Sequence, residues 1–441
     1  MHTYLVKFHP DFEKLVELKA KQKMWKVLFP QKEFKLKKLH DLMSELTVVS
    51  QKFITVHSLN QNEKLSSFAT AMAFIQRQMF EFSDKAVSKA EDLLKEEQTN
   101  SALDQLLFFF LKREMYYSPL ISKAPPAGEL LVEADKYLNH FFLIQRLKLV
   151  LETKLRARIF SNENALPLDV DHDALKDHKN LLVRIYYHLI LLEKDKDLES
   201  LISIEEMVLN ALPFCLKGDK NIIILTLINH ISHVYHKGQP TWVSYLLKMF
   251  RLGLEEGIFI NSNRIKHTTF LNIAVCAAAA NDFEFHQQFT DQYQKFLAPE
   301  INTPTICLST SYLYFHQNEF EKSIEKLNEL DYSKLPEFDF RFRNLSIRCL
   351  FEKALKDDTY WESLHSKILA FTQYLNRGDI LSANKVTSYK NFVSVTNKIM
   401  KAIRSKSLDQ QKKETLLKEI DQSQSIVSVN WLKEKIRRGD Q

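Results

Sequence analysis

Residues 304–331 have the sequence PTICLSTSYLYFHQNEFEKSIEKLNELD. A polar turn at 317–319 separates a first apolar segment from a second one, in which Phe320, Ile324 and Leu327 recur at helical spacing. This pattern predicts two antiparallel helices joined by a tight turn, which is one unit of a helical-repeat protein. Such a unit favours a role in binding over a role in catalysis.

The same order of a polar turn and then an aromatic residue occurs four times. The aromatic residues are Trp242, Phe283, Phe320 and Tyr360, at intervals of 41, 37 and 40 residues. An interval of about 40 residues accommodates two helices and two short turns. Because one hairpin cannot bury its apolar face alone, we expect neighbouring hairpins to stack. The predicted fold class is all-α, an α-solenoid of antiparallel helical hairpins wound into a right-handed superhelix.

Four segments are expected along the chain. Residues 1–60 form a basic N-terminal helical unit, and residues 61–160 form helical hairpins and a long helix. Residues 161–178 have no helical period and are predicted to be a loop or joint. Residues 179–441 form the solenoid, closed by a capping helix that contains Trp431.

Composition excludes several classes of enzyme. The chain has 7 glycines in 441 residues, although glycine usually makes up about 7% of a protein. Phosphate-binding loops and tight hairpins depend on glycine, so a Rossmann fold, a P-loop enzyme or a β-sandwich is excluded. No catalytic motif of a hydrolase or metalloprotease is present. We therefore expect no enzymatic activity and no cofactor.

The cysteines and the apolar stretches predict the cellular compartment of the protein. The 4 cysteines form no CxxC pair and lie in apolar helical contexts, which predicts buried, reduced thiols. No apolar stretch reaches the roughly 20 residues that a membrane-spanning helix needs. We expect a cytoplasmic protein without a membrane partner.

Both ends of the chain are basic. Residues 1–40 hold 10 Lys and 4 acidic residues, and residues 401–441 hold 10 Lys and Arg and 6 acidic residues. Anionic partners such as nucleic acid would bind there, although lysine-rich solvated helix faces have the same composition. No arginine or asparagine cluster starts the second helix to contact base edges. Its apolar residues from Leu36 to Phe53 are expected to pack into a core.

The hairpin at 304–331 resembles the tetratricopeptide repeat. Tyr314 stands where that repeat has a tyrosine on its first helix, and Ser311 and Ser323 occupy its small-residue positions. Asn318 replaces the usual turn glycine, and Cys307 stands where tryptophan is typical. The resemblance implies a repeat scaffold that binds a partner in the groove lined by the first helix of each hairpin.

Five stretches in chain order resemble a group of uncharacterised bacterial proteins built from tetratricopeptide-like helices. They are MWKVLFPQKEFKLKKLHDLMSELT, KYLNHFFLIQRLKL, KMFRLGLEEGIFINSNRI, FLNIAVCAAAANDFEF and YFHQNEFEKSIEKLNEL. This resemblance implies the helical-repeat fold and adds no catalytic residue.

The sequence offers two sets of candidate binding residues for a peptide or protein partner. In the best hairpin the groove face would present Thr305, Leu308, Ser309, Tyr312, Phe315 and His316, of which Tyr312, Phe315 and His316 are the predicted contacts. Arg341 and Arg343 in FRFR, followed by Arg348, interleave cations and aromatics as in sites for acidic peptides or single-stranded nucleic acid. Arginines that edge an amphipathic helix give the same pattern.

A weak metal candidate lies in NHISHVYH. His230, His233 and His236 are three residues apart and share one side of a helix. Three imidazoles can ligate zinc or copper, but no carboxylate or thiolate lies close in sequence. Histidines at a polar helix end explain the pattern equally, and we expect no metal.

Overall fold

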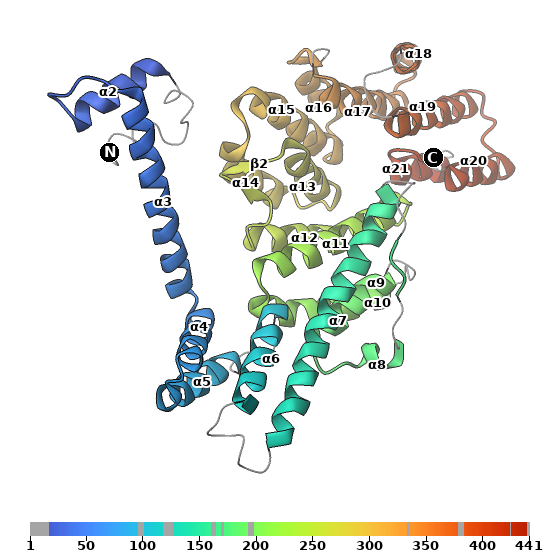
Figure 1. Cartoon of the computed structure of the whole chain (residues 1–441). Coiled ribbons are helices and arrows are strands. Elements are labelled where there is room, and N and C mark those ends of the chain that lie inside the picture. The colour runs from blue at the N-terminus through green and yellow to red at the C-terminus, as the bar shows by residue number, and fades with distance from the viewer. Residues whose placement is uncertain are drawn as a thin grey trace. The chain divides into compact units, whose positions relative to one another are not determined.

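The computed structural model (Figure 1) describes residues 17–95, 101–117, 127–159, 165–168, 172–192, 198–332, 335–377, 383–423 and 425–438. Nearly all regular structure in these residues is α-helical, which confirms the all-α fold class. The chain divides into two compact units, Met1–Leu143 and Ile144–Gln441. The division falls inside the long helix α7, before the segment 161–178 that the sequence marked as a joint.

The first unit is built from helices around two small cores. Its helices are α2 (Leu18–Leu28), α3 (Leu36–Gln61), α4 (Glu63–Gln76), α5 (Phe80–Lys95), α6 (Ala102–Tyr117) and the first part of α7 (Ala127–Ile159). Met24 and Trp25 of α2 bury Leu39 of α3. A second core joins α4, α5 and α6 around Phe108 and Leu111.

Helix α3 differs from the expectation that its apolar stripe is buried. Only Leu39 is fully buried, and Leu42 is partly buried against the α2 cluster. Every residue from 43 to 58 is exposed. The helical period was predicted correctly, but the described residues contain no element that packs against this stretch.

The second unit contains the remaining helices and one short hairpin. Its α-helices are α8 (His172–Lys176), α9 (Leu181–Leu192), α10 (Leu198–Ala211), α11 (Lys217–His236), α12 (Val243–Glu255), α13 (His267–Ala279), α14 (Phe283–Tyr293), α15 (Pro299–His316), α16 (Phe320–Asn328), α17 (Pro336–Ala354), α18 (Trp361–Asn376), α19 (Ala383–Arg404), α20 (Gln410–Gln422) and α21 (Val429–Arg438). The single-turn 3₁₀ helices are η3 (Leu212–Phe214), η4 (Pro240–Trp242), η5 (Gln294–Phe296) and η7 (Asp358–Tyr360).

Each of the four predicted turns joins two contacting helices. The pairs are α11 with α12, α13 with α14, α15 with α16, and α17 with α18. Gly238, Asn281 and Asn318 adopt positive φ at the ends of the first helices, where glycine and asparagine are tolerated best. After Asn281 and Asn318 the next N–H donates to the carbonyl five residues back, which closes the helix end.

Ser311 and Ser323 allow the helices of the best hairpin to approach closely. Both side chains are fully buried, and the Ser323 hydroxyl donates to the Ser311 carbonyl at 2.8 Å. The small side chains therefore bring the backbone of α15 within hydrogen-bond distance of α16.

A two-residue β-hairpin interrupts the helices between α12 and α13. Strand β1 (Ile260–Asn261) pairs antiparallel with β2 (Arg264–Ile265). Ser262 and Asn263 both have positive φ, as a type I′ turn requires. The sequence analysis did not predict this element.

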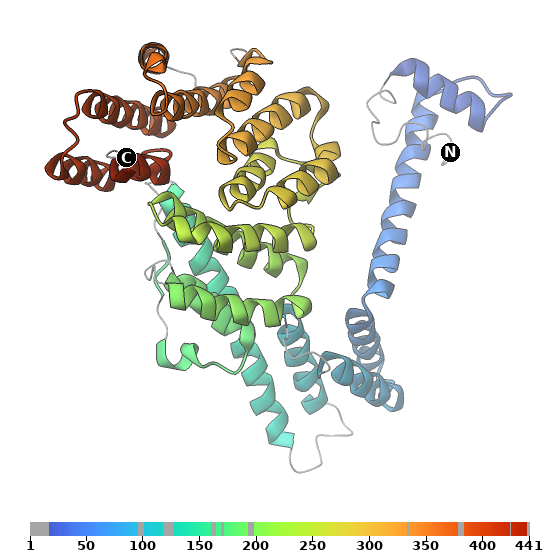
Figure 2. The same ribbon diagram turned by 180° about the vertical axis from the view of Figure 1, so that it is seen from behind.

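The C-terminal helix α21 joins distant parts of the second unit (Figures 1 and 2). It contacts α19, α20 and α11, and Trp431, Leu432 and Ile436 are buried, as the predicted capping helix required. The Asn430 side chain donates to the Tyr235 carbonyl of α11 at 2.9 Å. Helix α21 thus covers more than the last hairpin.

Two further expectations concern cysteines and membranes. Cys215, Cys276, Cys307 and Cys349 are free and buried, as predicted. Among the described residues, no helix has both the length and the hydropathy that crossing a membrane requires.

Candidate functional site

One side of α17 carries a row of polar residues toward the interior of the second unit. Arg341, Asn344, Arg348 and Glu352 are separated by three, four and four residues, which places them on one helical face. We call this row the arginine stripe. Pro336 at the first helical turn, where its missing N–H needs no partner, starts the helix.

Arg348 is the most unusual residue of the stripe because it is a buried cation without an anion. Its side chain is 9% exposed. Its guanidinium carbon lies 4.2 Å from the ring centre of Phe315 and 5.7 Å from that of Trp431. In the described part of the chain, Nε is buried without an acceptor and no carboxylate forms an ion pair with this arginine. Two aromatic rings offset only part of the desolvation of the guanidinium.

The two residues before Arg348 in the stripe extend the same donor-rich surface. Asn344 is 4% exposed, and its Oδ1 accepts from the Ser428 hydroxyl at 3.2 Å. Its Nδ2 is buried and lacks an acceptor among the described residues. Arg341 donates to Oδ1 of Asn272 on α13 at 3.0 Å. The stripe therefore presents N–H donors to an acceptor that the described chain does not supply.

Glu352 closes the stripe and is fully neutralised. Its carboxylate accepts from Trp431 Nε1 at 2.7 Å and pairs with Lys435 Nζ at 2.6 Å. Both partners come from α21, so this helix forms one wall beside Arg348. Glu352 forms its ion pair with Lys435, and among the described residues no ion pair joins it to Arg348.

Two histidines near the arginines are held neutral. Burial, then the charge of Arg348 and the neighbouring His286, lowers the pKa of His316 to about 3. Partial desolvation and then the charge of Arg341 lower the pKa of His236, although this histidine keeps an exposed edge. Near neutral pH the positive charge of the site therefore comes from the two arginines.

Acidification should destabilise the second unit through His316. The unfolded chain holds this histidine at its ordinary pKa of 6.5, so it binds more protons than the folded chain between pH 6.5 and about 3. The stability contributed by neutral His316 is complete above pH 6.5 and declines below it, by at most about 1.4 kcal/mol per pH unit. Urea unfolding at pH 7, 5.5 and 4.5 should show a shallower decline for His316→Gln. The exposed His40→Gln is the control, and an equal decline in all three proteins would contradict the assignment.

The predicted groove contacts on α15 need correction. Tyr312 and Phe315 are each 6% exposed and belong to the large hydrophobic core. Thr305, Leu308 and Ser309 are fully buried. Helix α15 contacts α13, α16 and α17, so its expected groove face is covered. Of these predicted contacts, Phe315 and the partly buried His316 both lie next to Arg348 of the arginine stripe.

The structure separates the two arginines of FRFR. Residues two positions apart lie on opposite sides of a helix. Arg343 pairs with Asp339 at 2.9 Å and lies 4.2 Å from the ring centre of Tyr374, so its guanidinium is already occupied. Arg341 faces α13 and belongs to the stripe. Asn344 was missed, although its spacing from Arg341 and Arg348 was available as a signal.

The three histidines of α11 are not brought together as metal ligands. His230 is buried with its ring 6.1 Å from that of Trp242, whereas His236 is exposed. Within the described residues, no group of three or more His, Cys, Asp or Glu side chains is placed to hold a metal ion. His233 and His236 instead line a cavity of about 220 Å³ with Ser425 and Val429.

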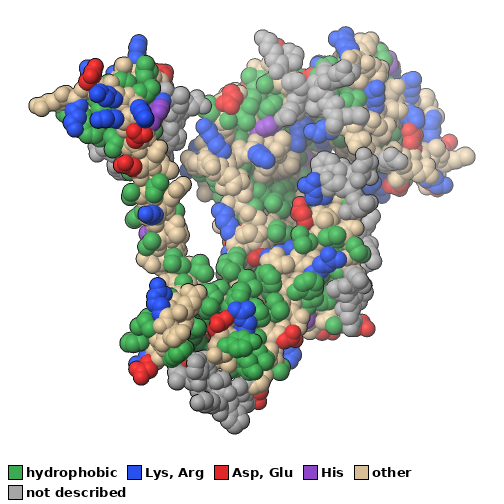
Figure 3. All heavy atoms as spheres, viewed as in Figure 1, with side chains coloured by type: hydrophobic (Ala, Val, Ile, Leu, Met, Phe, Trp, Pro, Cys, Tyr) green, Lys and Arg blue, Asp and Glu red, His purple; other side chains and the backbone are tan. Residues whose placement is uncertain are grey.

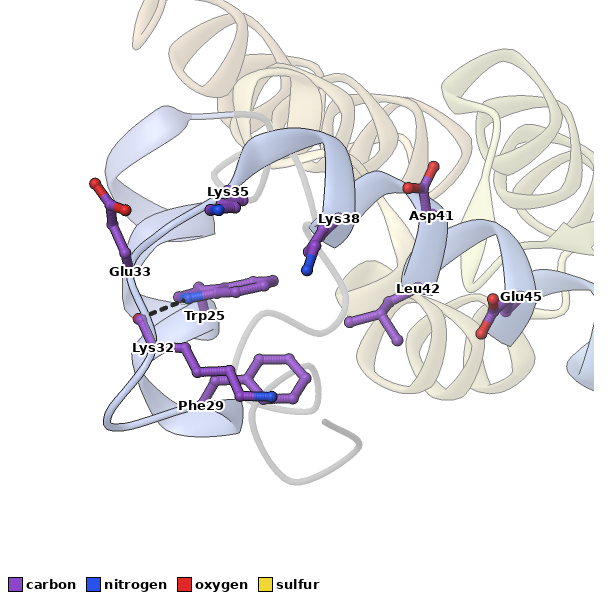
Figure 4. Close-up of a pocket in the computed structure, with 9 residues that line it drawn as sticks. All are labelled: Trp25, Phe29, Lys32, Glu33, Lys35, Lys38, Asp41, Leu42 and Glu45. Carbon is purple, nitrogen blue, oxygen red and sulfur yellow. Dashed lines mark hydrogen bonds between the residues drawn. The ribbon is translucent and has the colours of Figure 1, made fainter.

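A second cavity lies in the first unit, away from any predicted site residue. It measures about 510 Å³, and Trp25, Phe29 and Leu42 form its apolar lining (Figure 4). Lys32, Lys35 and Lys38 surround it, and Trp25 Nε1 donates to the Lys32 carbonyl at 3.0 Å.

No family model, no curated protein and no solved structure matches the chain. The fold and the site alone therefore describe this protein: its structure is nearly all helical, and its second unit buries Arg348, which forms no ion pair with a carboxylate of the described residues.

Proposed function

We propose that the chain is a non-enzymatic protein–protein interaction scaffold that binds an acidic segment of a peptide or protein partner at the arginine stripe. In this proposal the second unit is a solenoid of tetratricopeptide-like hairpins, wound as a right-handed superhelix, of the kind found in uncharacterised bacterial relatives. Consecutive hairpins that contact their neighbours support this arrangement. Four free, buried cysteines support a reducing compartment such as the cytoplasm.

The observation that carries the proposal is the burial of Arg348 without an ion pair to any carboxylate in the described part of the chain. A guanidinium binds a carboxylate through two parallel hydrogen bonds, and Asn344 Nδ2 adds a third donor. An acidic side chain or a terminal carboxylate would supply the missing charge. The aromatic rings beside Arg348 would pack against the apolar part of the segment.

Removal of Arg348 should weaken binding of an acidic peptide about 10- to 100-fold, because a charge-assisted hydrogen bond contributes about 1.5–3 kcal/mol. The measurement is fluorescence anisotropy of a labelled glutamate-rich peptide with wild-type protein and Arg348→Gln. Arg343→Gln is the matched control, since that arginine lies on the same helix but is paired with Asp339. Circular dichroism should show equal helix content in all three proteins.

Two results would contradict the proposal. One is failure of the wild-type protein to bind any member of an array of acidic peptides. The other is an equal loss of binding in Arg343→Gln and Arg348→Gln. Competition by inorganic phosphate that is as strong as that by the peptide would indicate a site for a free anion instead.

The wild-type protein and the Arg348→Gln variant also test the alternative partner, nucleic acid bound at the basic ends. Binding of RNA or DNA there would fall steeply with salt through counterion release. Binding through residues 1–40 should be unchanged in Arg348→Gln, because this arginine belongs to the other unit. For residues 401–441 the salt dependence makes the distinction, because Trp431 of this segment lies beside Arg348.

A further inference from the structure

Helix α3 exposes an apolar surface that no described residue covers. Val49 is 62% exposed and Phe53 is 66% exposed, and Leu46 and Val56 are exposed as well. Figure 3 shows hydrophobic side chains along this helix. Because most helices in proteins are held by packing of an apolar face, a solvated stretch of this length requires a partner.

Six apolar residues of α3, four of them exposed, follow the spacing of a coiled coil, whereas Met43, Val48 and Ile54 are exposed outside this row. Leu39, Leu42, Leu46, Val49, Phe53 and Val56 alternate in steps of three and four, as a and d positions of a heptad do. Leu39 is already covered by Met24 and Trp25. Leu42 is partly buried against the same cluster, and the residues from Leu46 to Val56 are exposed. We call the row from Leu42 to Val56 the α3 seam.

We propose that the α3 seam pairs with the α3 seam of a second copy of this chain, in antiparallel orientation. A two-fold axis that places Leu46 opposite Val49 of the second copy also places Leu42 opposite Phe53. The same axis brings Glu45 beside Lys52 of the second copy, twice in the dimer, at positions that flank the seam. These charges are complementary, which selects a second copy and its direction.

A parallel pair lacks this complementarity. It would place Glu45 near Ser50 and Lys52 near His57 of the second copy, so no opposite charges would meet. The alternation of charge along one helix therefore favours the antiparallel arrangement over the parallel one.

The cavity beside Leu42 supplies a place for the exposed aromatic ring. In the antiparallel pair, Phe53 of the second copy lies opposite Leu42, which lines the cavity together with Trp25 and Phe29. The pairing would bury the ring of Phe53 among aromatic side chains, where burial of an aromatic residue contributes most. In the antiparallel dimer, the cavity of each copy would thus receive the Phe53 ring of the other copy.

Sedimentation equilibrium of the full chain tests the pairing. The wild-type protein should have twice the chain mass of 51.8 kDa at micromolar concentration. Val49→Glu with Phe53→Glu should be monomeric, because each change places a charge in an apolar layer. Gln51→Glu with Ser58→Glu adds the same charge on the opposite side of the helix and should remain dimeric.

Charge exchange tests the direction. Glu45→Lys or Lys52→Glu alone turns two attractive pairs into two repulsive ones and should raise the dimer Kd about tenfold. Both changes together restore opposite charges and should return the Kd to within about threefold of the wild-type value. A parallel pair would respond to neither exchange in this manner.

Three results would overturn the proposal. A wild-type monomer throughout the micromolar range would mean that another partner or another helix of the same chain covers the seam. A dimer that persists in Val49→Glu with Phe53→Glu would place the interface elsewhere. Failure of the double charge exchange to restore the Kd would exclude the antiparallel arrangement.

Discussion

Asp219→Ala should lower the free energy of unfolding of the second unit by about 3–5 kcal/mol, the usual effect of removing one partner from a buried ion pair. Asp219 is 3% exposed. Its carboxylate pairs with Lys148 Nζ at 2.5 Å and accepts from the Tyr186 hydroxyl at 2.5 Å. The substitution leaves a mostly buried ammonium and a buried hydroxyl without an acceptor, and urea unfolding followed by circular dichroism measures the loss.

A triple substitution separates this cause from general damage to the core. Asp219→Leu with Lys148→Met and Tyr186→Phe removes every polar member of the cluster and should recover most of the lost stability, because apolar replacement of a whole buried network is often neutral. Loss of less than about 1 kcal/mol in Asp219→Ala, or equal loss in the triple variant, would contradict this account.

Trp431→Ala should lower the free energy of unfolding by about 3–5 kcal/mol, as truncation of a buried tryptophan does. The ring packs at 5.3 Å from the ring centre of Phe351 and at 6.0 Å from that of Phe392. Its loss also removes a donor from Glu352 and one of the two rings beside Arg348. Hydrogen exchange of α21 should therefore accelerate more than that of the α15–α16 hairpin.

Trp431→Phe is the matched control for the indole hydrogen bond. It keeps an aromatic ring against Phe351 but loses the bond to Glu352 and part of the buried ring, so we expect a loss of about 1.5–3 kcal/mol, smaller than that of the alanine variant. If the phenylalanine and alanine variants unfold at the same urea concentration, ring packing is not what holds α21 in place.

The sequence predicted the hairpins because local chemistry determines them. Asn281 and Asn318 tolerate positive φ, and the aromatic residue after each of these turns starts the next helix. The turns between paired helices could therefore be located without tertiary information. The β-hairpin was missed because its loop is Ser262-Asn263, without the glycine that usually marks a type I′ turn.

Burial could not be predicted from helical period alone. Tyr312 and Phe315 were expected to line a groove, but α15 is packed against α13, α16 and α17 and is apolar on several sides. On α3 the prediction was wrong in the other direction: Val49 and Phe53 were expected to be buried in a core, but they are exposed. In both cases period identified the apolar face, and only the neighbouring elements determined what that face meets.

The candidate site was predictable in part. Arg341 and Arg348 were singled out from the sequence, and helical geometry alone separates them from Arg343. The residues beside Arg348 could not be predicted from the sequence, because Trp431 and Lys435 are about eighty residues from Glu352 and contact it only in the folded chain. Its burial and the lack of an ion pair with any carboxylate of the described residues are properties of the folded chain, and they distinguish Arg348 from an ordinary surface cation.

The hydrogen bond from Asn430 to Tyr235 spans 195 residues and has a consequence for biosynthesis. Hairpins form from neighbouring residues and can fold as they leave the ribosome, whereas a contact of such long range forms late. A chain interrupted before Val429 would contain every hairpin from α11 to α18 but would lack the wall beside Arg348. If an acidic segment binds as proposed and needs this wall, its binding would distinguish chains that contain α21 from chains that lack it.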